Sequence, residues 1–425
     1  MMSARRSTRA SNDRVESLAP NLAHVLAVIA LAVFAAIHFR VGAGRVAPSS
    51  GDASDSKSVS AGFAFPTETM ASASASLGSH PAGRKLTVDD LILGCSPLAG
   101  IYASSTPERA TETVRAALDA GITRFDTAPH YGLGLSERRL GDALRECGAD
   151  MSKTRVYTKV GRVMKPKDEV TASEKESVVE WGNVPGDPGC IFPDAPVDVL
   201  PVLDYTGPGF RRSHADSLAR LNLRSVDGLR IHDAEDEARY AQANAGGGVA
   251  ELVKLRDEGA INEVSLGMND ATFVRRMLED NPPNTFDSVM MAGAWNLLDQ
   301  DGEDVLLECE RRGVAVHNAG IFASGLLVGG SHYKYAPAPP DIVARTERWR
   351  ALAEDKHGVP LPAVAIAFAC APRVVKGCAV GVKSPEEVAQ SVAWLADANA
   401  VPAQLWVDAK ELGLLAPDVP TPSPA

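Results

Sequence analysis

The sequence predicts a single (β/α)8 barrel, also called a TIM barrel, and three observations support that fold class. From Leu86 onward, short apolar runs alternate with longer amphipathic segments, which is typical of parallel strands joined by helical crossovers. The alternation repeats over about 330 residues, enough for eight units, and fits a closed barrel better than an open sheet. The first strand candidate is followed by LGCSPLAG, which lacks the G-x-G-x-x-G of a Rossmann fold.

The expected elements follow in chain order. Strands are predicted from short runs rich in Val, Ile, Leu and Phe: LILGC around 92–95, then 122–126, 156–160, 226–232, 263–268, 288–293, 314–320 and 377–382. Helices are predicted from apolar spacing near 3.6: 107–121, 136–146, 211–223, 248–259, 271–280 and 304–313, with two further helical stretches before the last strand.

One connection breaks this rhythm. About fifty residues rich in Pro and Gly separate Lys159 from the helix expected at 211–223. Most connections are a handful of residues long, and a longer one is usually functional or disordered. On a barrel we expect this insert at the face that carries the site.

The first 85 residues differ from the rest in composition. The apolar run 22–39 has arginines on both sides and nearly the length of a bilayer core, so we expect a transmembrane signal-anchor or a targeting leader there. The Ser/Ala/Gly-rich stretch after it predicts a disordered linker. The expected domains are a leader (1–85), a barrel (86–416) and a disordered Pro-rich tail (417–425). We expect a membrane-anchored or organelle-targeted location, for instance in a plastid, with the cytosol as the alternative.

Charge and cysteine usage narrow the class of partner. The net charge is −11 and the expected barrel has no basic block, which argues against nucleic acid. The six cysteines are scattered without C-x-x-C spacing, so we expect no metal site and no disulfide framework. A small molecule is the expected partner, and the oligomeric state is left open.

Four polar side chains stand where barrel strands are expected to end, which is the face that carries the chemistry of such barrels. Asp126, Lys159 and His232 end the second, third and fourth strands, and Tyr131 lies in a glycine-bracketed loop past Asp126. An unpaired buried Asp or Lys is costly, whereas the two compensate when they face each other. An ammonium favours a nearby phenolate, so we expect Lys159 to lower the pKa of Tyr131 towards neutrality. His232 would orient a substrate oxygen.

The stretch FDTAPHYGLGLSERRLG, with TKVGR after it, resembles the signature segments of the aldo-keto reductases, and the resemblance covers nearly all of residues 88–416. It implies that Asp126, Tyr131, Lys159 and His232 are the catalytic tetrad and that NADP or NAD lies across the barrel mouth. The insert, the strand with IHD and the tail GVKSPEEVAQSVAWL are similar to the D-threo-aldose (L-fucose) dehydrogenase branch. That similarity implies NAD(P)-dependent oxidation of an aldose at C1 to the lactone.

The resemblance also implies binding residues. Those for the cofactor are Asn269, Ser324, Gly325, Leu326, Gly381, Lys383, Ser384 and Gln390, and those for the substrate are His130 and Trp295. Two positions depart from the family pattern. Ala292 stands where relatives often have Gln, and Gln390 with Ser391 replaces Glu-Asn. The choice between NAD and NADP therefore stays open.

Two other functions remain open. The same tetrad would serve an NADPH-dependent aldehyde or ketone (carbonyl) reductase. A cofactor-binding subunit with low turnover would keep the barrel but would be free to lose Tyr131 or Lys159, and this chain keeps both.

Overall fold

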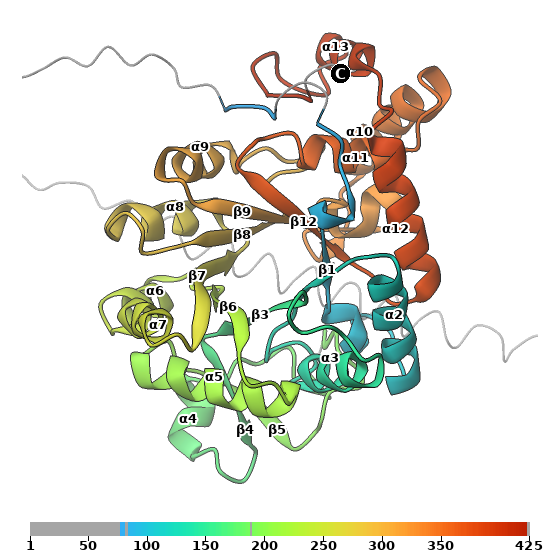
Figure 1. Ribbon diagram of the computed structural model, residues 1–425. Helices are drawn as coiled ribbons and strands as arrows, with labels where there is room; N and C mark the ends of the chain where they lie inside the picture. The colour runs from blue at the N-terminus through green and yellow to red at the C-terminus, as the bar shows by residue number, and fades with distance from the viewer. Residues whose placement is uncertain (1–76, 81–83, 188, 423–425) are drawn as a thin grey trace, which may run out of the picture. The chain divides into compact units, whose positions relative to one another are not determined.

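The computed structural model describes residues 77–80, 84–187 and 189–422. Eight parallel strands of this part close into a barrel in the order β1-β12-β9-β8-β7-β6-β3-β2 (Figure 1), which confirms the predicted fold class. Each expected strand coincides with or overlaps an observed one. The barrel strands are β1 (Leu91–Gly94), β2 (Arg124–Asp126), β3 (Arg155–Val160), β6 (Val226–His232), β7 (Ile261–Met268), β8 (Ser288–Ala292), β9 (Ala315–Ala319) and β12 (Val375–Gly381).

Helices surround the barrel and bury their apolar faces against the strands in one large core. The first begins as the sequence predicts, with Pro107 after the N-cap Thr106, whose side chain accepts a hydrogen bond from the backbone of Arg109. The α-helices are α2 (Pro107–Asp119), α3 (Leu135–Glu146), α5 (Gly207–Leu221), α6 (Glu237–Asn244), α7 (Gly248–Asp257), α8 (Ala271–Asp280), α9 (Glu303–Arg312), α10 (Pro340–Arg350), α11 (Leu361–Ala369), α12 (Pro385–Ala398) and α13 (Ala403–Glu411). Shorter turns are η1 (Val88–Asp90), η2 (Ser96–Ala99), η3 (Ala323–Val328) and η4 (Ala351–Lys356).

The long insert after β3 has a structure of its own. Its strands β4 (Arg162–Pro166) and β5 (Val199–Leu203) pair in antiparallel fashion, and α4 (Ala172–Ser177) lies between them in the chain. In Figure 1 these elements extend past the ring of helices beside α5, at the lower edge of the view. A small apolar core holds the insert together, made of Val170, Val179, Val184, Leu200 and Val202.

The described segments at both ends of the chain pack against the barrel. Leu77 is buried, and the backbone N–H of Gly78 donates to Glu310 Oε2 at 3.1 Å. Near the other end Val419 is buried as well. The expected domain boundaries remain predictions. Leu77 and Val419, which lie outside the expected barrel of residues 86–416, nevertheless belong to its hydrophobic core.

The expected transmembrane helix is contradicted. In the part of the chain that the structure describes, no helix is both long and apolar enough to cross a bilayer. Residues 22–39, on which the anchor was placed, and the linker after them lie outside the described residues. For the described residues this finding contradicts the expected anchor, and the membrane-anchored or organelle-targeted location derived from it is not proposed again.

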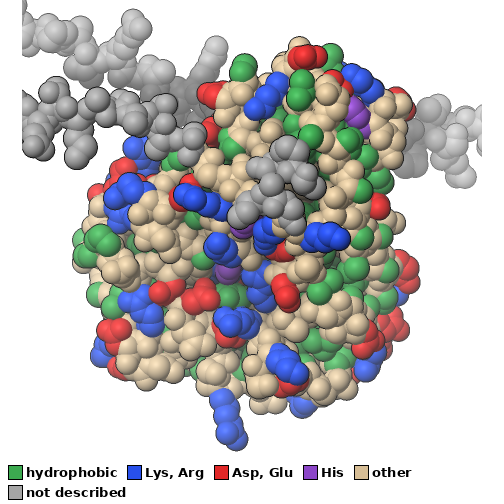
Figure 2. Space-filling model, turned by 45° about the horizontal axis from the view of Figure 1, so that its top comes forward, with side chains coloured by type: hydrophobic (Ala, Val, Ile, Leu, Met, Phe, Trp, Pro, Cys, Tyr) green, Lys and Arg blue, Asp and Glu red, His purple; other side chains and the backbone are tan. Residues whose placement is uncertain are grey.

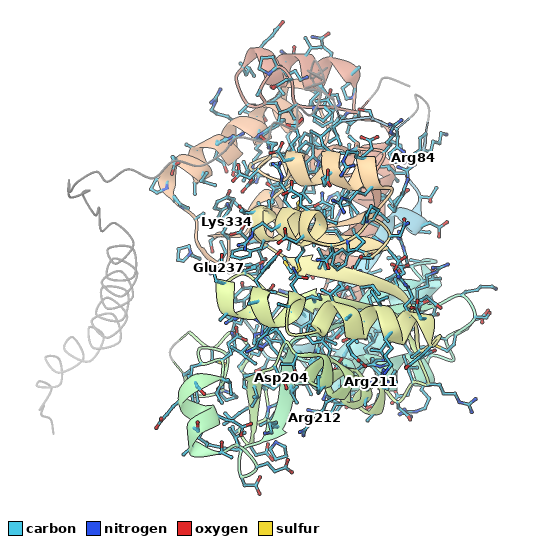
Figure 3. The ribbon with its side chains drawn as sticks, turned by 90° about the vertical axis from the view of Figure 1, so that its left-hand side faces the viewer. Arg84, Asp204, Arg211, Arg212, Glu237 and Lys334 are labelled. Carbon is cyan, nitrogen blue, oxygen red and sulfur yellow. The ribbon has the colours of Figure 1, made fainter. Side chains whose placement is uncertain are left out.

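The surface of the barrel carries charges of both signs. Acidic and basic side chains are interspersed over the face shown in Figure 2, with several basic ones near its middle. Some form ion pairs between neighbouring helices, as Arg276 of α8 does with Glu237 of α6 at 2.6 Å. Figure 3 shows Lys334 and Glu237 at one end of the barrel and Arg84 at the other. Glu237 follows the carboxyl end of β6. The end of the barrel that carries Lys334 and Glu237 is therefore the end at which the strands finish.

Candidate active site

The four expected tetrad residues meet at the carboxyl end of the barrel. Lys159 Nζ donates to Asp126 Oδ1 at 2.5 Å and to Tyr131 Oη at 3.1 Å. Its third hydrogen bond goes to the carbonyl oxygen of Thr127 at 2.9 Å. The His232 ring stands edge-on to the Tyr131 ring, with centroids 5.9 Å apart. The Lys159 ammonium therefore bridges the Asp126 carboxylate and the Tyr131 phenol.

The loop between β2 and α3 turns Tyr131 back over the barrel. Gly132 and Gly134 adopt positive φ angles of 60° and 90°, which glycine tolerates best. A Cβ on Gly132 would lie 2.7 Å from the Cβ of Ala99, so this turn has no room for a side chain. The two glycines that follow the tyrosine therefore serve its placement.

Arg230 is a site residue that the sequence analysis missed. It is wholly buried inside the barrel, and its Nε donates to Asp126 Oδ2 at 2.7 Å. Its two Nη atoms lie 2.7 Å from Ser265 Oγ and 2.8 Å from His317 Nδ1, which must accept because guanidinium only donates. The signal was present in the sequence. Arg230 lies two positions before His232, and residues two apart in a strand point to the same face.

Burial governs the proton affinities of the tetrad. Burial raises the pKa of Tyr131 above its usual value, and the charge of Lys159 offsets only part of that rise. Burial also opposes the charged form of Lys159, but Asp126 and Tyr131 together outweigh it and the pKa of the lysine is raised. Burial lowers the pKa of His232 well below its usual value. The expected shift of the Tyr131 pKa towards neutrality is therefore wrong for this site.

A pocket of about 460 Å³ lies against the tetrad. His130, one of the two expected substrate residues, lines it, and its ring stands edge-on to His232 with centroids 6.1 Å apart. The insert supplies the opposite wall, which the sequence analysis did not resolve into residues: Glu180, Asn183, Ile191 and Phe192.

Trp295, the other expected substrate residue, is placed in the core instead. Its side chain is fully buried and stacks on Phe368 of α11, with ring centroids 5.1 Å apart. A large apolar ring gains more from this packing than from a polar pocket. Trp295 does not line the tetrad pocket, so the structure corrects its expected contact with substrate.

A second cleft, of about 870 Å³, continues across the barrel mouth. Asn269, Ala292, Gly320 and Tyr335 line both cavities, which therefore form one groove. Part of its lining consists of small residues, Ala292, Gly293, Ala294 and Gly320, which leave the backbone open to a ligand. A Cβ on Gly320 would lie 2.7 Å from the backbone nitrogen of Gly293. An extended ligand with polar groups along its length fits such a groove.

The hairpin of β10 (His332–Tyr333) and β11 (Ala336–Pro337) reaches over this groove. At its tip, Tyr335 Oη donates to Asn269 Oδ1 at 3.3 Å, and Lys334 Nζ lies 2.8 Å from Asp299 Oδ2. The amide nitrogen of Asn269, Nδ2, donates to Asp233 Oδ1 at 3.2 Å. Asn269 thus sits at the junction of the two cavities, where its amide can exchange these partners for a ligand.

The other expected cofactor residues divide into two groups. Ser324 lines the groove with a positive φ of 57°, Gly325 follows it in η3, Gly381 lines the tetrad pocket, and Leu326 is buried. Lys383, Ser384 and Gln390 stand at or beyond the start of α12 and line neither cavity. There the Lys383 ammonium lies 3.6 Å from Glu387 Oε1, and Ser384 caps the helix.

A barrel with a buried acid–base cluster beside a long polar groove has the make-up of an oxidoreductase that works with a dissociable cofactor. Comparison with protein families makes this definite. Residues 90–400 match the model of the Aldo/keto reductase family. That match covers well over half of the chain, so the protein belongs to the aldo/keto reductase family. The resemblance of its motifs is thereby confirmed, and members of this family use a nicotinamide cofactor.

Several curated relatives are dehydrogenases. A pyridoxal 4-dehydrogenase of Microbacterium luteolum is 34% identical over 342 residues, covering 78% of this chain and 95% of that protein. A D-threo-aldose 1-dehydrogenase of a Pseudomonas species is 31% identical over 348 residues, covering 80% and 98%. An L-galactose dehydrogenase of Arabidopsis thaliana is 27% identical over 308 residues, covering 72% and 84%.

Solved structures share the fold. A glycerol dehydrogenase from Gluconobacter oxydans superposes with a TM-score of 0.55 at 21% identity, over 83% of this chain and 98% of that one. The holo form of an aldo-keto reductase from Bacillus halodurans gives 0.53 at 21% identity, over 74% and 91%. At this level of identity the likeness supports the barrel alone.

Proposed function

We propose that this protein is an NAD(P)-dependent dehydrogenase that oxidises an aldose at C1 to the lactone. The observation that carries the proposal is the position of Lys159 Nζ, which contacts both Asp126 and Tyr131 at the floor of a pocket. The named substrates of the three relatives support it. Aldoses, galactose and pyridoxal each hold an aldehyde and a hydroxyl group that can close to a cyclic hemiacetal, the form whose oxidation yields a lactone.

In this mechanism Tyr131 takes the proton of the C1 hydroxyl while the C1–H bond breaks and the C1=O bond forms. The ammonium of Lys159 stabilises the phenolate that accepts this proton. His232 is neutral because burial lowers its pKa, and it hydrogen-bonds the C1 oxygen and orients it. A bound nicotinamide supplies the acceptor for the hydrogen that leaves C1 with its electron pair.

The groove across the barrel mouth is the proposed cofactor site. Asn269 would bind the carboxamide, and the turn at Ser324 and Gly325 would present backbone N–H groups to the pyrophosphate. Leu326 would support that turn from the core. The adenosine end would extend beyond the groove, past Gly381 to Lys383, Ser384 and Gln390 at the start of α12 and within it. Either NAD or NADP is proposed, since Lys383 alone supplies a cation in that segment.

One observation favours a second candidate. The raised pKa of Tyr131 keeps the phenol protonated at neutral pH, and a protonated phenol is the form that donates a proton in carbonyl reduction. The same site would then act as an aldehyde or ketone reductase.

A substrate panel tests both candidates. We expect the protein to reduce NAD or NADP with at least one of L-fucose, L-galactose and D-arabinose. An increase in the absorbance of the reduced nicotinamide measures this oxidation. A decrease in that absorbance, when simple aldehydes are added with the reduced cofactor, measures the reverse reaction. Turnover of aldehydes alone would favour the reductase. Cofactor binding without turnover in either direction would leave only a cofactor-binding subunit.

A further inference from the structure

The insert brings a fixed carboxylate to the wall of the tetrad pocket. Glu180 lines the pocket, and its carboxylate is bound by Arg162, with Nη2 donating to Oε1 at 2.8 Å and Nε to the other oxygen. A second guanidinium, from Arg239, lies 3.4 Å from Oε1. Both arginines hold the carboxylate in place. The Glu180 side chain remains 16% exposed, so part of it still faces the pocket.

A buried imidazole faces this carboxylate. His130 Nδ1 is buried and has no hydrogen-bond partner among the described residues, and it lies 3.7 Å from Glu180 Oε2. Burial lowers the pKa of His130 to about 3, so the ring is neutral at neutral pH. Burial opposes the charge on Glu180, but its hydrogen bonds to Arg162 lower its pKa to about 2. A neutral ring beside a carboxylate prefers its proton on the facing nitrogen.

We propose that His130 and Glu180 form a hydroxyl-binding subsite that selects a polyhydroxylated substrate. A hydroxyl oxygen would accept the N–H of His130, and its hydrogen would be donated to Glu180. One hydroxyl group thus satisfies the buried nitrogen and a free lone pair of the carboxylate. This inference rests on the proposed function, because it places the hydroxyl next to a C1 that reacts at the tetrad.

The surroundings match the ring of a sugar. The bound hydroxyl would lie near C1, since the His130 and His232 rings are 6.1 Å apart. Phe192 and Tyr131, with centroids 6.3 Å apart, offer an apolar wall to ring C–H groups. A substrate without the hydroxyl would exclude water from this subsite without replacing its hydrogen bonds, so the polar atoms of His130 and Glu180 would be left unpaired. Sites of this kind reject the analogue that lacks the hydrogen-bonding group.

The first experiment compares sugars with 2-hydroxytetrahydropyran, a cyclic hemiacetal that has the ring and the reacting C1 but no other ring hydroxyls. We expect kcat/KM for the best of L-fucose, L-galactose and D-arabinose to exceed that of this probe at least about a hundredfold. Equal values, or turnover of the probe alone, would overturn the subsite while the dehydrogenase stands. Failure of all four compounds would overturn the proposed function instead.

The second experiment uses variants. Glu180→Gln and His130→Phe should each lower the ratio of kcat/KM for the sugar to kcat/KM for the probe about ten- to a hundredfold. The second variant retains a ring to pack against Phe192. Glu176→Gln, an exposed change in α4 of the same insert, is the control and should match the wild type. An equal loss on sugar and probe would show that Glu180 only supports the fold, and would overturn the subsite.

Discussion

Arg230 Nε donates to Oδ2 of Asp126 at 2.7 Å, while Lys159 holds Oδ1 of the same carboxylate. One buried carboxylate is thus shared by two cations, and all three side chains are at most 3% exposed. This cluster of three charged groups next to the proton-transferring tyrosine therefore carries a net positive charge. Its energetic role can be tested without reference to turnover.

Arg230→Met should reduce the free energy of unfolding by about 1–3 kcal/mol, because the buried acceptors lose the hydrogen bonds of the guanidinium while Lys159 still balances the charge of Asp126. The variant keeps most of the side-chain volume but removes the Arg230 hydrogen bonds to His317 Nδ1 and to Ser265 Oγ, which Ser288 Oγ also contacts at 2.9 Å. Urea unfolding followed by circular dichroism measures the change. Arg155→Met, an exposed change on β3, should stay within about 0.5 kcal/mol. A loss of the same small size at Arg230 would show that the buried charge is not stabilised by these partners.

Tyr131→Phe should lower turnover by roughly two to four orders of magnitude, because it removes the proton acceptor. Binding of the cofactor should persist, which tryptophan fluorescence quenching can measure. Tyr240→Phe provides the matched control, since this hydroxyl bonds Asp280 on the outer helices. Near-normal turnover of Tyr131→Phe would remove the proposed mechanism.

The rate of oxidation should rise with pH. The acceptor form of Tyr131 is the phenolate, and its pKa lies above the usual value of about 10. Below that pKa the phenolate fraction grows about tenfold per pH unit, so kcat/KM for oxidation should climb from about pH 6 to 9. Reduction needs the phenol and should stay flat over the same window. An oxidation rate independent of pH would contradict this assignment of Tyr131.

Cofactor choice should depend on the start of α12. Lys383→Ala should weaken NADP binding by about 1.5–3 kcal/mol, the range for a hydrogen bond to a charged group, and leave NAD nearly unchanged. Glu387→Gln should strengthen NADP, because its carboxylate lies 3.6 Å from the Lys383 ammonium. KM values for both cofactors measure these effects. Equal losses for NAD and NADP would show that Lys383 does not bind the 2′-phosphate.

A chain that begins at Leu86 should be less stable than one that begins at Leu77, by about 2–4 kcal/mol. The longer chain keeps one buried leucine and the backbone hydrogen bonds of residues 77–80, such as the one from Arg373 N to Gly78 O at 2.8 Å. Thermal and urea unfolding of the two chains test this. Identical stability would place the boundary of the fold at Leu86.

The barrel could be predicted because each strand has a short apolar run and each helix the spacing of one buried face. The tetrad followed, because parallel strands end on the same side and Asp126, Lys159 and His232 each stand at such an end. Arg230 was overlooked although it shares the face of His232, because barrel interiors are usually filled by aliphatic side chains.

Other features could not be predicted from local patterns. The path of the insert depends on its own small core, so the approach of Glu180 to His130 is visible only in three dimensions. The resemblance implied that Trp295 is a substrate residue, but packing on Phe368 decides its position. The pKa of Tyr131 depends on how deeply the ring is buried, which a charge pattern in sequence does not reveal.

The insert also separates two properties of the protein that can be changed independently of each other. The tetrad stands on β2, β3 and β6 and in the loop after β2, whereas Glu180 and Phe192 come from one segment between β3 and α5 with its own apolar core. A replacement of that segment would exchange one wall of the pocket and leave the reacting groups in place. Grafting such segments between relatives is therefore a route to new substrates on an unchanged catalytic barrel.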